Sequence, residues 1–188
     1  MTIGILALQG DVAKHEQSIG ALDVKSIRVR TTSELNTIDG LIIPGGESTT
    51  IGKLLVRFSM FDRLKKLIEA GLPVYGTCAG IILLAKDIEQ YDQIKIGLLD
   101  ITVQRNGYGP QIESFETDIS APVLGEERVK AVFIRAPIIT RIGKNVEVLS
   151  TFENKPILVK EKNLLGGTFH PELAGEVRIH KYFIAMIG

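Results

Sequence analysis

The 188-residue chain contains a single cysteine, no tryptophan and only 6% aromatic residues. One cysteine cannot form an internal disulfide, and the absence of a cysteine–histidine cluster predicts no metal site. The 22 Lys and Arg residues balance 22 Asp and Glu residues. The resulting net charge of zero gives no field to attract nucleic acid or an anionic membrane surface, so we expect neither as a partner.

The chain also lacks a long apolar run. No stretch approaches the roughly 20 apolar residues that a membrane span needs, and the first residues contain neither a charged leader nor a small-residue cleavage site. The hydrophobic content of 45% is ample for one core, and the length suits one domain, residues 1–188. We therefore expect a compact, single-domain cytoplasmic protein.

Two different patterns divide the chain. Apolar runs at 2–8, 40–46 and 73–77 are typical of buried strands, and the alternating run at 24–30 is typical of a strand nearer an edge; helical patterns separate the four runs. Such alternation predicts βαβ units and a parallel sheet. After residue 95, short strand-like runs joined by tight turns predict antiparallel strands, the last three of them as a meander. The runs lie at 98–104, 114–119, 129–135, 146–152, 155–161 and 164–169. We expect an α/β three-layer sandwich with a mostly parallel central sheet, flanking helices and a smaller antiparallel β section.

The lone cysteine lies in "YGTCAG", between a predicted strand and a predicted helix. Gly76 and Gly80 flank Cys78 at positions −2 and +2, the thiol counterpart of the G-x-S-x-G nucleophile elbow. A helix that begins at Ala79 would point its free N–H groups and its positive end at the sulfur, which favours the reactive thiolate. The alternative is a small buried packing residue.

The segment "GGTFHPE" places His170 and Glu172 on either side of Pro171. Proline disfavours a helix at the preceding residue, and side chains at i and i+2 of an extended segment point the same way. This arrangement suits a general base that a carboxylate orients. The alternative is an ordinary turn at the start of a helix, which would have the same sequence.

The other two histidines give less indication of a catalytic role. His15 lies in a weakly helical segment, and His180 follows Glu176 by four residues, which predicts a surface pair on a helix.

In "PGGEST", two glycines before a helix offer unobstructed backbone N–H groups that suit an oxyanion or another anion. That segment also fits an ordinary turn into a helix capped by Ser48 or Thr49.

The segments "PGGEST", "GTCAG" and "FHPE", in this order, resemble class I (triad) glutamine amidotransferases. The segments "GILALQGDVAKHE", "RNGYGPQIESFE", "FIRAP" and "GGTFHPEL" narrow the resemblance to the glutaminase subunits of two-component pyridoxal 5′-phosphate synthases. The resemblance spans nearly the whole chain. It implies a flavodoxin-like fold of the class I amidotransferase type.

The resemblance implies hydrolysis of L-glutamine to L-glutamate and ammonia, with no metal or organic cofactor. The ammonia would pass to a separate barrel-fold synthase subunit for vitamin B6 biosynthesis. Cys78 would be the nucleophile, His170 the base and Glu172 its orienting partner, and the backbone N–H groups of Gly46 and Ala79 would hold the oxyanion. The positions that match glutamine-binding residues are Gly46, Glu47, Ser48, Arg105, Ile134 and Arg135.

The resemblance also implies that the glutaminase is weak until it docks on the synthase. A peptide beside glycine flips easily, so the oxyanion donor could turn inward only when a partner presses on it. The segment "LQGDVAKHE", with Gln9 and His15, is the candidate contact. One departure from the family pattern stands out, because Tyr108 and Pro110 replace an aromatic and a basic residue.

Two alternatives stay open from the sequence. A triad glutaminase could serve another acceptor, such as the imidazole glycerol phosphate pathway, although "ALQG" and "PGGEST" argue against it. A non-catalytic relative, or a cysteine hydrolase of the DJ-1/PfpI type, is the second alternative. The presence of Cys78, His170 and Glu172 together argues against a catalytically inactive relative. A hydrolase of the DJ-1/PfpI type is not expected to contain the "FHPE" segment near the C-terminus.

Overall fold

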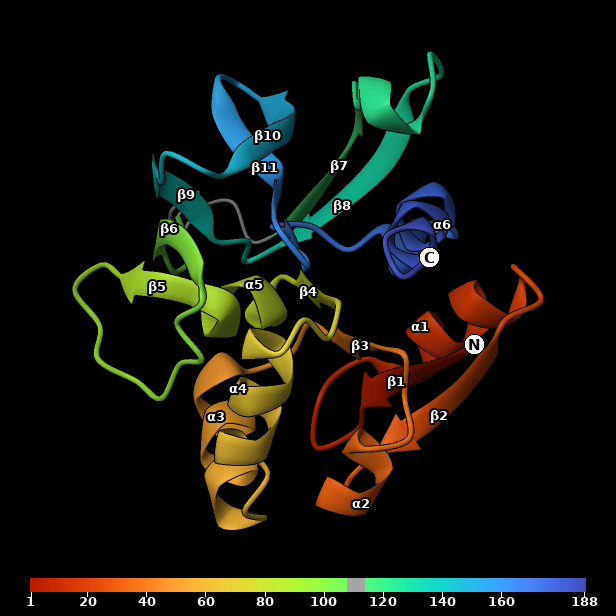
Figure 1. Ribbon diagram of the computed structural model, residues 1–188. Coiled ribbons are helices and arrows are strands. Elements are labelled where there is room, and N and C mark those ends of the chain that lie inside the picture. The colour runs from red at the N-terminus through yellow and green to blue at the C-terminus, as the bar shows by residue number, and fades with distance from the viewer. Residues whose placement is uncertain (108–113) are drawn as a thin grey trace.

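The computed structural model describes residues 1–107 and 114–188. Five short strands form the parallel part of a seven-stranded sheet, whose order is β10-β11-β12-β4-β3-β1-β2 (Figure 1). All of them except the edge strand β2 are buried for most or all of their length, which explains their near-continuous apolar sequences, whereas β2 is buried only at its last residue. The parallel strands are β1 (Thr2–Leu6), β2 (Lys25–Val29), β3 (Gly40–Ile43), β4 (Val74–Thr77) and β12 (Leu164–Gly167).

The predicted antiparallel meander extends this central sheet. Strands β10 (Glu147–Phe152) and β11 (Lys155–Glu161) form a hairpin, and β11 pairs antiparallel with β12. Strand β12 in turn pairs parallel with β4. The late strand β12 therefore brings the segment that carries His170 next to the strand that leads into Cys78.

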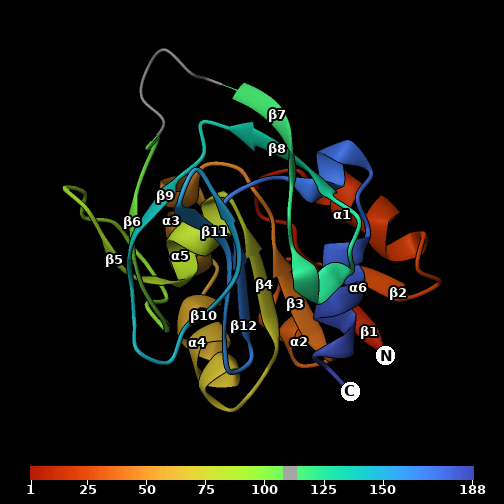
Figure 2. The same ribbon diagram turned by 90° about the horizontal axis from the view of Figure 1, so that it is seen from above.

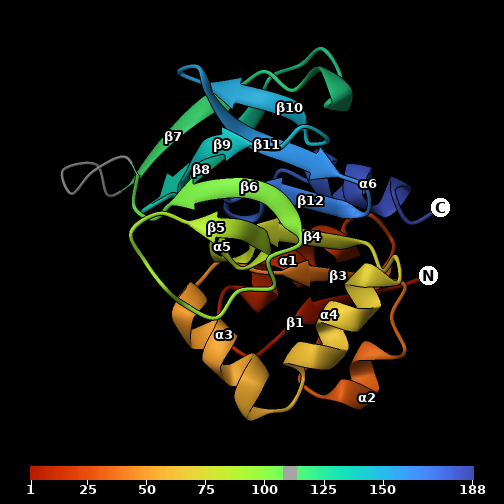
Figure 3. The ribbon, with the colours of Figure 1, turned by 60° about the vertical axis from the view of Figure 1, so that its left-hand side comes forward.

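Two small sheets complete the β structure (Figure 3). One contains β5 (Ala85–Ile88), β6 (Leu99–Gln104) and β9 (Ile138–Ile142), and the other pairs β7 (Ser114–Ile119) with β8 (Val129–Ile134). The sequence patterns predicted β6, β7 and β8 but missed β5 and β9. Because β5 holds only four residues, two of them exposed, it shows no clear alternation of its own.

Helices cover both faces of the central sheet, which confirms the predicted three-layer arrangement (Figure 2). The core on one face includes residues of α3, α4 and α5, and the core on the other face includes residues of α1 and α6. In the described ranges, no helix has both the length and the apolar character to cross a membrane. The helices are α1 (Val12–Gly20), α2 (Thr32–Leu35), α3 (Ser48–Arg57), α4 (Phe61–Glu69), α5 (Ala79–Leu84) and α6 (Arg178–Ala185), with 3-10 turns at Pro122–Leu124 and Pro171–Ala174.

The cap of α3 differs from the prediction. Glu47, not Ser48 or Thr49, is the N-cap, and its carboxylate accepts hydrogen bonds from the backbone N–H groups of Thr49 and Thr50. A carboxylate satisfies two free N–H groups at once and also interacts favourably with the helix dipole. At the end of α4, which stops at Glu69, the C-cap residue Ala70 is followed by Gly71, whose φ of +107° lets it terminate the helix.

Candidate active site

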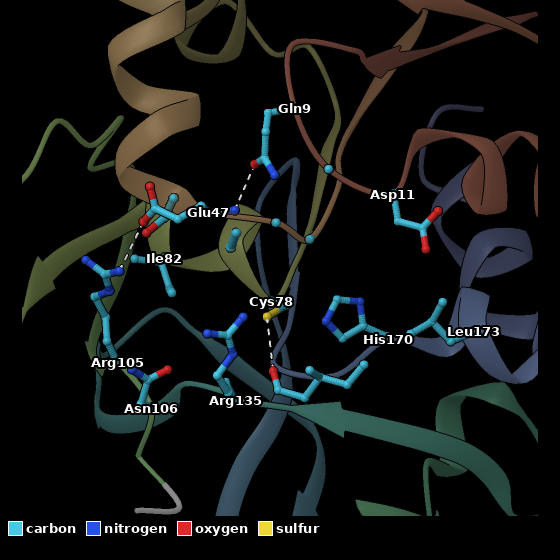
Figure 4. A pocket seen from close by; sticks show the side chains of 16 residues that line it. Gln9, Asp11, Glu47, Cys78, Ile82, Arg105, Asn106, Arg135, His170 and Leu173 are labelled. Atoms are coloured by element: carbon cyan, nitrogen blue, oxygen red, sulfur yellow. Dashed lines mark hydrogen bonds and ion pairs between the residues drawn. The ribbon is translucent and has the colours of Figure 1, made fainter. Parts of the chain in front are cut away.

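A pocket of about 380 Å³ opens at the carboxyl ends of the central strands, where ligands of open α/β sheets bind (Figure 4). It brings together segments that lie far apart in the sequence, at the ends of β1, β3, β4, β6, β8 and β12. The lining residues are Gln9, Gly10, Asp11, Gly45, Gly46, Glu47, Ser48, Cys78, Ala79, Ile82, Arg105, Asn106, Ile134, Arg135, His170 and Leu173.

Cys78 occupies a strained turn between β4 and α5. Its φ of 49° and ψ of −100° lie outside the regions that non-glycine residues favour. A Cβ atom on Gly76 would lie 2.6 Å from the carbonyl carbon of Gly80, and one on Gly80 would lie 2.2 Å from the carbonyl oxygen of Ile43. The two glycines are therefore required by close packing, and the turn has the geometry of a nucleophile elbow.

His170 and Glu172 follow β12 on a turn that reaches the same pocket. The Nδ1 atom of His170 lies 2.8 Å from Oε1 of Glu172, and the backbone N–H of His170 donates to the carbonyl of Val132 at 2.8 Å. Glu172 is only 3% exposed and lies behind the ring, outside the pocket wall. Cys78, His170 and Glu172 thus come together in the order of a triad.

Opposing effects set the protonation of His170. Burial by itself would lower the pKa of the ring, but hydrogen bonds and negative charge from Cys78 and Glu172 outweigh burial and raise the pKa to about 10. The pocket therefore favours the protonated form of the ring, the form that results when His170 accepts a proton from Cys78. The sulfur of Cys78 also contacts the carbonyl oxygen of Ile134, 3.9 Å away, to which a thiol can donate.

The Gly45–Glu47 segment passes beside Cys78 and His170. A Cβ on Gly45 would lie 2.2 Å from Cε1 of His170, so only glycine lets the imidazole approach so closely. The carbonyl of Gly45 accepts a hydrogen bond from the N–H of Asp11 (3.3 Å), and the N–H of Glu47 donates to Oε1 of Gln9 (2.8 Å). The loop after β1 thus fixes the segment with two hydrogen bonds.

Arg105 lines the opposite wall and is held by several neighbours. Its guanidinium donates to Oε1 of Glu47 (3.1 Å), Oε1 of Gln93 (3.0 Å) and Oγ1 of Thr49 (3.2 Å), and it stacks 4.3 Å from the centre of the Tyr91 ring. Burial would raise the pKa of Glu47, but hydrogen bonds from Thr50 and Thr49 lower it to about 2. A positive and a negative side chain therefore face the pocket together.

The remaining predicted residues also lie at the pocket. Ser48 is buried at the start of α3 and its hydroxyl donates to Gln93 Oε1 at 3.1 Å, while Ala79 begins α5 directly after the cysteine. Ile134 is the last residue of β8, and Arg135, which follows the strand, has a φ of 41°. All predicted catalytic, oxyanion and glutamine-binding positions except the buried Glu172 line this one pocket.

Two histidine predictions are wrong. His180 is fully buried, not on the surface, because Glu176 precedes α6 and pairs instead with Arg178. The side chain of His15 is also fully buried, so it cannot be a partner contact, whereas Gln9 stays partly exposed. Their spacing carried a signal for burial, because His15 precedes the apolar Ile19 by four residues and His180 adjoins the apolar stripe of the last helix.

Four further residues line the pocket although the sequence analysis assigned them no role: Asp11, Ile82, Asn106 and Leu173. Three of them, Asp11, Asn106 and Leu173, lie within the segments that carry the family resemblance, and this was the signal that could have found them. Tyr108 and Pro110, which depart from the family pattern, lie outside the described residues. Within 1–107 and 114–188, no group of three or more His, Cys, Asp or Glu side chains is arranged to hold a metal ion.

The model of the SNO glutamine amidotransferase family matches residues 5–188. The chain belongs to this family. It is 53% identical over 188 residues to the pyridoxal 5′-phosphate synthase subunit PdxT of Moorella thermoacetica, and 51% identical over 187 residues to that of Thermotoga petrophila. Each comparison covers 100% of both chains.

Solved structures agree with the assignment to the SNO family. One, described as a glutamine amidotransferase, superposes with a TM-score of 0.94 at 43% identity and covers 99% of this chain and 98% of its own. PurLQS from Thermotoga maritima superposes with a TM-score of 0.72 over 100% of this chain and 98% of its own. At 14% identity, that second likeness shows the fold alone.

Proposed function

We propose that the protein is the glutaminase subunit of a pyridoxal 5′-phosphate synthase, which hydrolyses L-glutamine and delivers the ammonia to a barrel-fold synthase subunit. The observation that carries the chemistry is the meeting of Cys78, on its strained elbow, with the His170–Glu172 pair in one pocket. The identity of 51–53% to PdxT subunits, which extends over the whole chain, supports the synthase subunit as the acceptor of the ammonia. A cytoplasmic location stays a prediction from the sequence.

The geometry supports a thioester route. His170 takes the proton of the Cys78 thiol, and its pKa of about 10 favours this transfer before glutamine arrives. The sulfur attacks the side-chain amide carbon, and the backbone N–H groups of Gly46 and Ala79 hold the resulting oxyanion. Collapse of this intermediate breaks the C–N bond, and His170 returns its proton to the departing ammonia.

Water completes the reaction. His170 removes a proton from a water molecule, which attacks the γ-glutamyl thioester and releases glutamate and the Cys78 thiol. Glu172 orients the imidazole and stabilises its positive charge throughout. Around the substrate, Arg105 pairs with the α-carboxylate, and the carbonyl of Ile134 and the carboxylate of Glu47 accept from the α-ammonium. Ser48 and Arg135 complete the glutamine site.

Control by the partner acts through the loop after β1. Because Gln9 and Asp11 bind the segment that contains Gly46, pressure of a synthase on this loop reaches the oxyanion donor directly. Glutamine hydrolysis is therefore expected to be slow in the isolated chain and faster with the synthase. Equal rates in both conditions would refute this control.

The decisive experiment compares the wild type with Cys78→Ala, each with and without the synthase subunit. We expect Cys78→Ala to abolish glutamate release and glutamine-dependent synthesis, while synthesis from added ammonium salt continues. Glutamine turnover that survives the substitution would refute the thioester route. Wild-type glutamine turnover that supports no glutamine-dependent synthesis by the synthase subunit would instead indicate another acceptor for the ammonia.

A further inference from the structure

A buried polar chain continues from the active site into the protein interior. His15 on α1 and His180 on α6 are both fully buried, and Nδ1 of His15 lies 2.9 Å from Nε2 of His180. Their ring centres are 5.2 Å apart. The mechanism above uses neither residue, although two buried histidines in direct contact are costly to desolvate unless both are hydrogen-bonded.

The other side of His15 faces the triad. Its Nε2 atom lies 3.5 Å from Oε1 of Glu172 and 3.3 Å from Oγ1 of Thr77, the residue before Cys78. The same Oε1 atom interacts with Nδ1 of His170 at 2.8 Å. The second carboxylate oxygen, Oε2, is buried and has no hydrogen-bond partner among the described residues. The groups around Oε1 therefore fix the orientation of Glu172.

Charge decides which nitrogen of His15 carries the proton. A proton on Nδ1 would leave the Nε2 lone pair facing the negatively charged oxygen of Glu172, which is repulsive. A proton on Nε2 makes that contact attractive, and Nδ1 then accepts from the Nε2–H group of His180. Burial is the main cause that lowers the pKa of each histidine to about 4, so both rings are neutral at pH 7.

We propose that His15 is a positioning residue for the triad: its neutral ring, held by His180, donates Nε2–H towards Glu172 and Thr77 and fixes the carboxylate that orients His170. The inference rests on the proposed glutaminase function. A neutral donor holds the carboxylate without adding a positive charge that would compete with His170 for it. The contact to Thr77 extends the same support to the residue that precedes the nucleophile.

Two substitutions separate positioning from packing. His15→Leu removes both nitrogen contacts at similar volume, whereas His15→Gln keeps an amide N–H group that can reach Glu172. With the synthase present, we expect His15→Leu to lower kcat for glutamine hydrolysis by about 10- to 100-fold with little change in KM, because misplacement of a catalytic group acts mainly on the chemical step. His15→Gln should restore most of the loss, and ammonia-dependent synthesis should be unchanged in both.

A wild-type kcat in folded His15→Leu would overturn the proposal, as would equal losses in the Leu and Gln variants. A measurement on the wild type does not depend on how the variants fold. In long-range ¹H–¹⁵N spectra of the ¹⁵N-histidine-labelled chain at pH 7, we expect a protonated Nε2 and a bare Nδ1 for His15. The opposite tautomer would overturn the proposal even in an active enzyme, whereas the expected tautomer without glutamine turnover would refute the proposed function alone.

Discussion

The side-chain carbonyl of Gln9 accepts a hydrogen bond from the backbone N–H of Glu47 at 2.8 Å, although 38 residues separate them. This bond links the loop after the first strand to the segment that begins the proposed glutamine site. A Cβ on the intervening Gly46 would lie 2.5 Å from the same Gln9 oxygen, so the contact is tight as well as polar. The partly exposed loop thus connects the protein surface with the pocket that contains Cys78.

Substitution of Gln9 should weaken stimulation by the synthase. In Gln9→Ala, the Glu47 N–H loses its partner, and we expect the ratio of glutaminase rates with and without synthase to fall by about 5- to 30-fold, the effect of 1–2 kcal/mol. Gln17→Ala is the matched control, because Gln17 is exposed on α1 and does not line the pocket. An unchanged stimulation ratio in Gln9→Ala would contradict a role for this loop.

The elbow glycine Gly80 should tolerate no side chain. The Cβ of Gly80→Ala would lie 2.2 Å from the backbone oxygen of Ile43, which cannot move without distorting β3. We expect the free energy of unfolding to fall by about 1–3 kcal/mol or more and glutamine turnover to be lost. Urea unfolding and a glutaminase assay test this, with Gly20→Ala as control because its Cβ would meet no atom within 4 Å. A Gly80→Ala protein as stable and active as Gly20→Ala would refute the elbow.

Arg105 should act mainly on substrate affinity. Arg105→Ala removes the cation proposed for the α-carboxylate, so we expect KM for glutamine to rise by about 10- to 100-fold, equivalent to 1.4–2.8 kcal/mol, with a smaller change in kcat. Arg57→Ala, at the exposed end of α3, should leave both constants unchanged. Steady-state kinetics with the synthase would disprove the assignment if KM stayed constant and kcat alone fell.

The buried histidines should make the fold sensitive to acid. Burial lowers the pKa of His15 and His180 to about 4, whereas unfolded histidine titrates near 6.5. Below pH 6.5 only the unfolded state takes up these protons, so the free energy of unfolding decreases by up to about 1.4 kcal/mol per pH unit for each histidine. His170, with a pKa of about 10, is charged in both states there, and its own contribution is lost only as the pH rises from 6.5 to 10.

Urea titrations at about pH 7, 6.5 and 5.5 measure this effect. Carboxylates with lowered pKa values, such as Glu47 at about 2, lose their contribution mainly as the pH falls below about 5.5, so the window reports mainly on the buried histidines. His15→Leu should reduce the pH dependence of the free energy of unfolding in this range. The same pH dependence in wild type and variant would contradict the lowered pKa of His15.

Local sequence was enough to predict the parts of the site that depend on neighbouring residues. The glycines on both sides of Cys78 and the His170-Pro-Glu172 spacing each describe a turn whose geometry is set within five residues. The parallel first half was likewise predictable, because strands buried on both faces have continuous apolar runs. Strands β5 and β9 escaped prediction, since they are short, partly exposed strands stabilised by pairing with β6.

The sequence by itself was enough to single out Cys78, His170 and Glu172 and to predict the kind of sheet that carries them. Only the tertiary structure decided that His15 and His180 are interior residues in contact with each other, and that His15 lies behind Glu172. The physical reason is distance along the chain: 165 residues separate the two histidines, and they meet only because α1 and α6 cover the same face of the sheet. Helical periodicity can indicate which face of each helix is buried, but the packing of the helices decides which buried polar groups face one another.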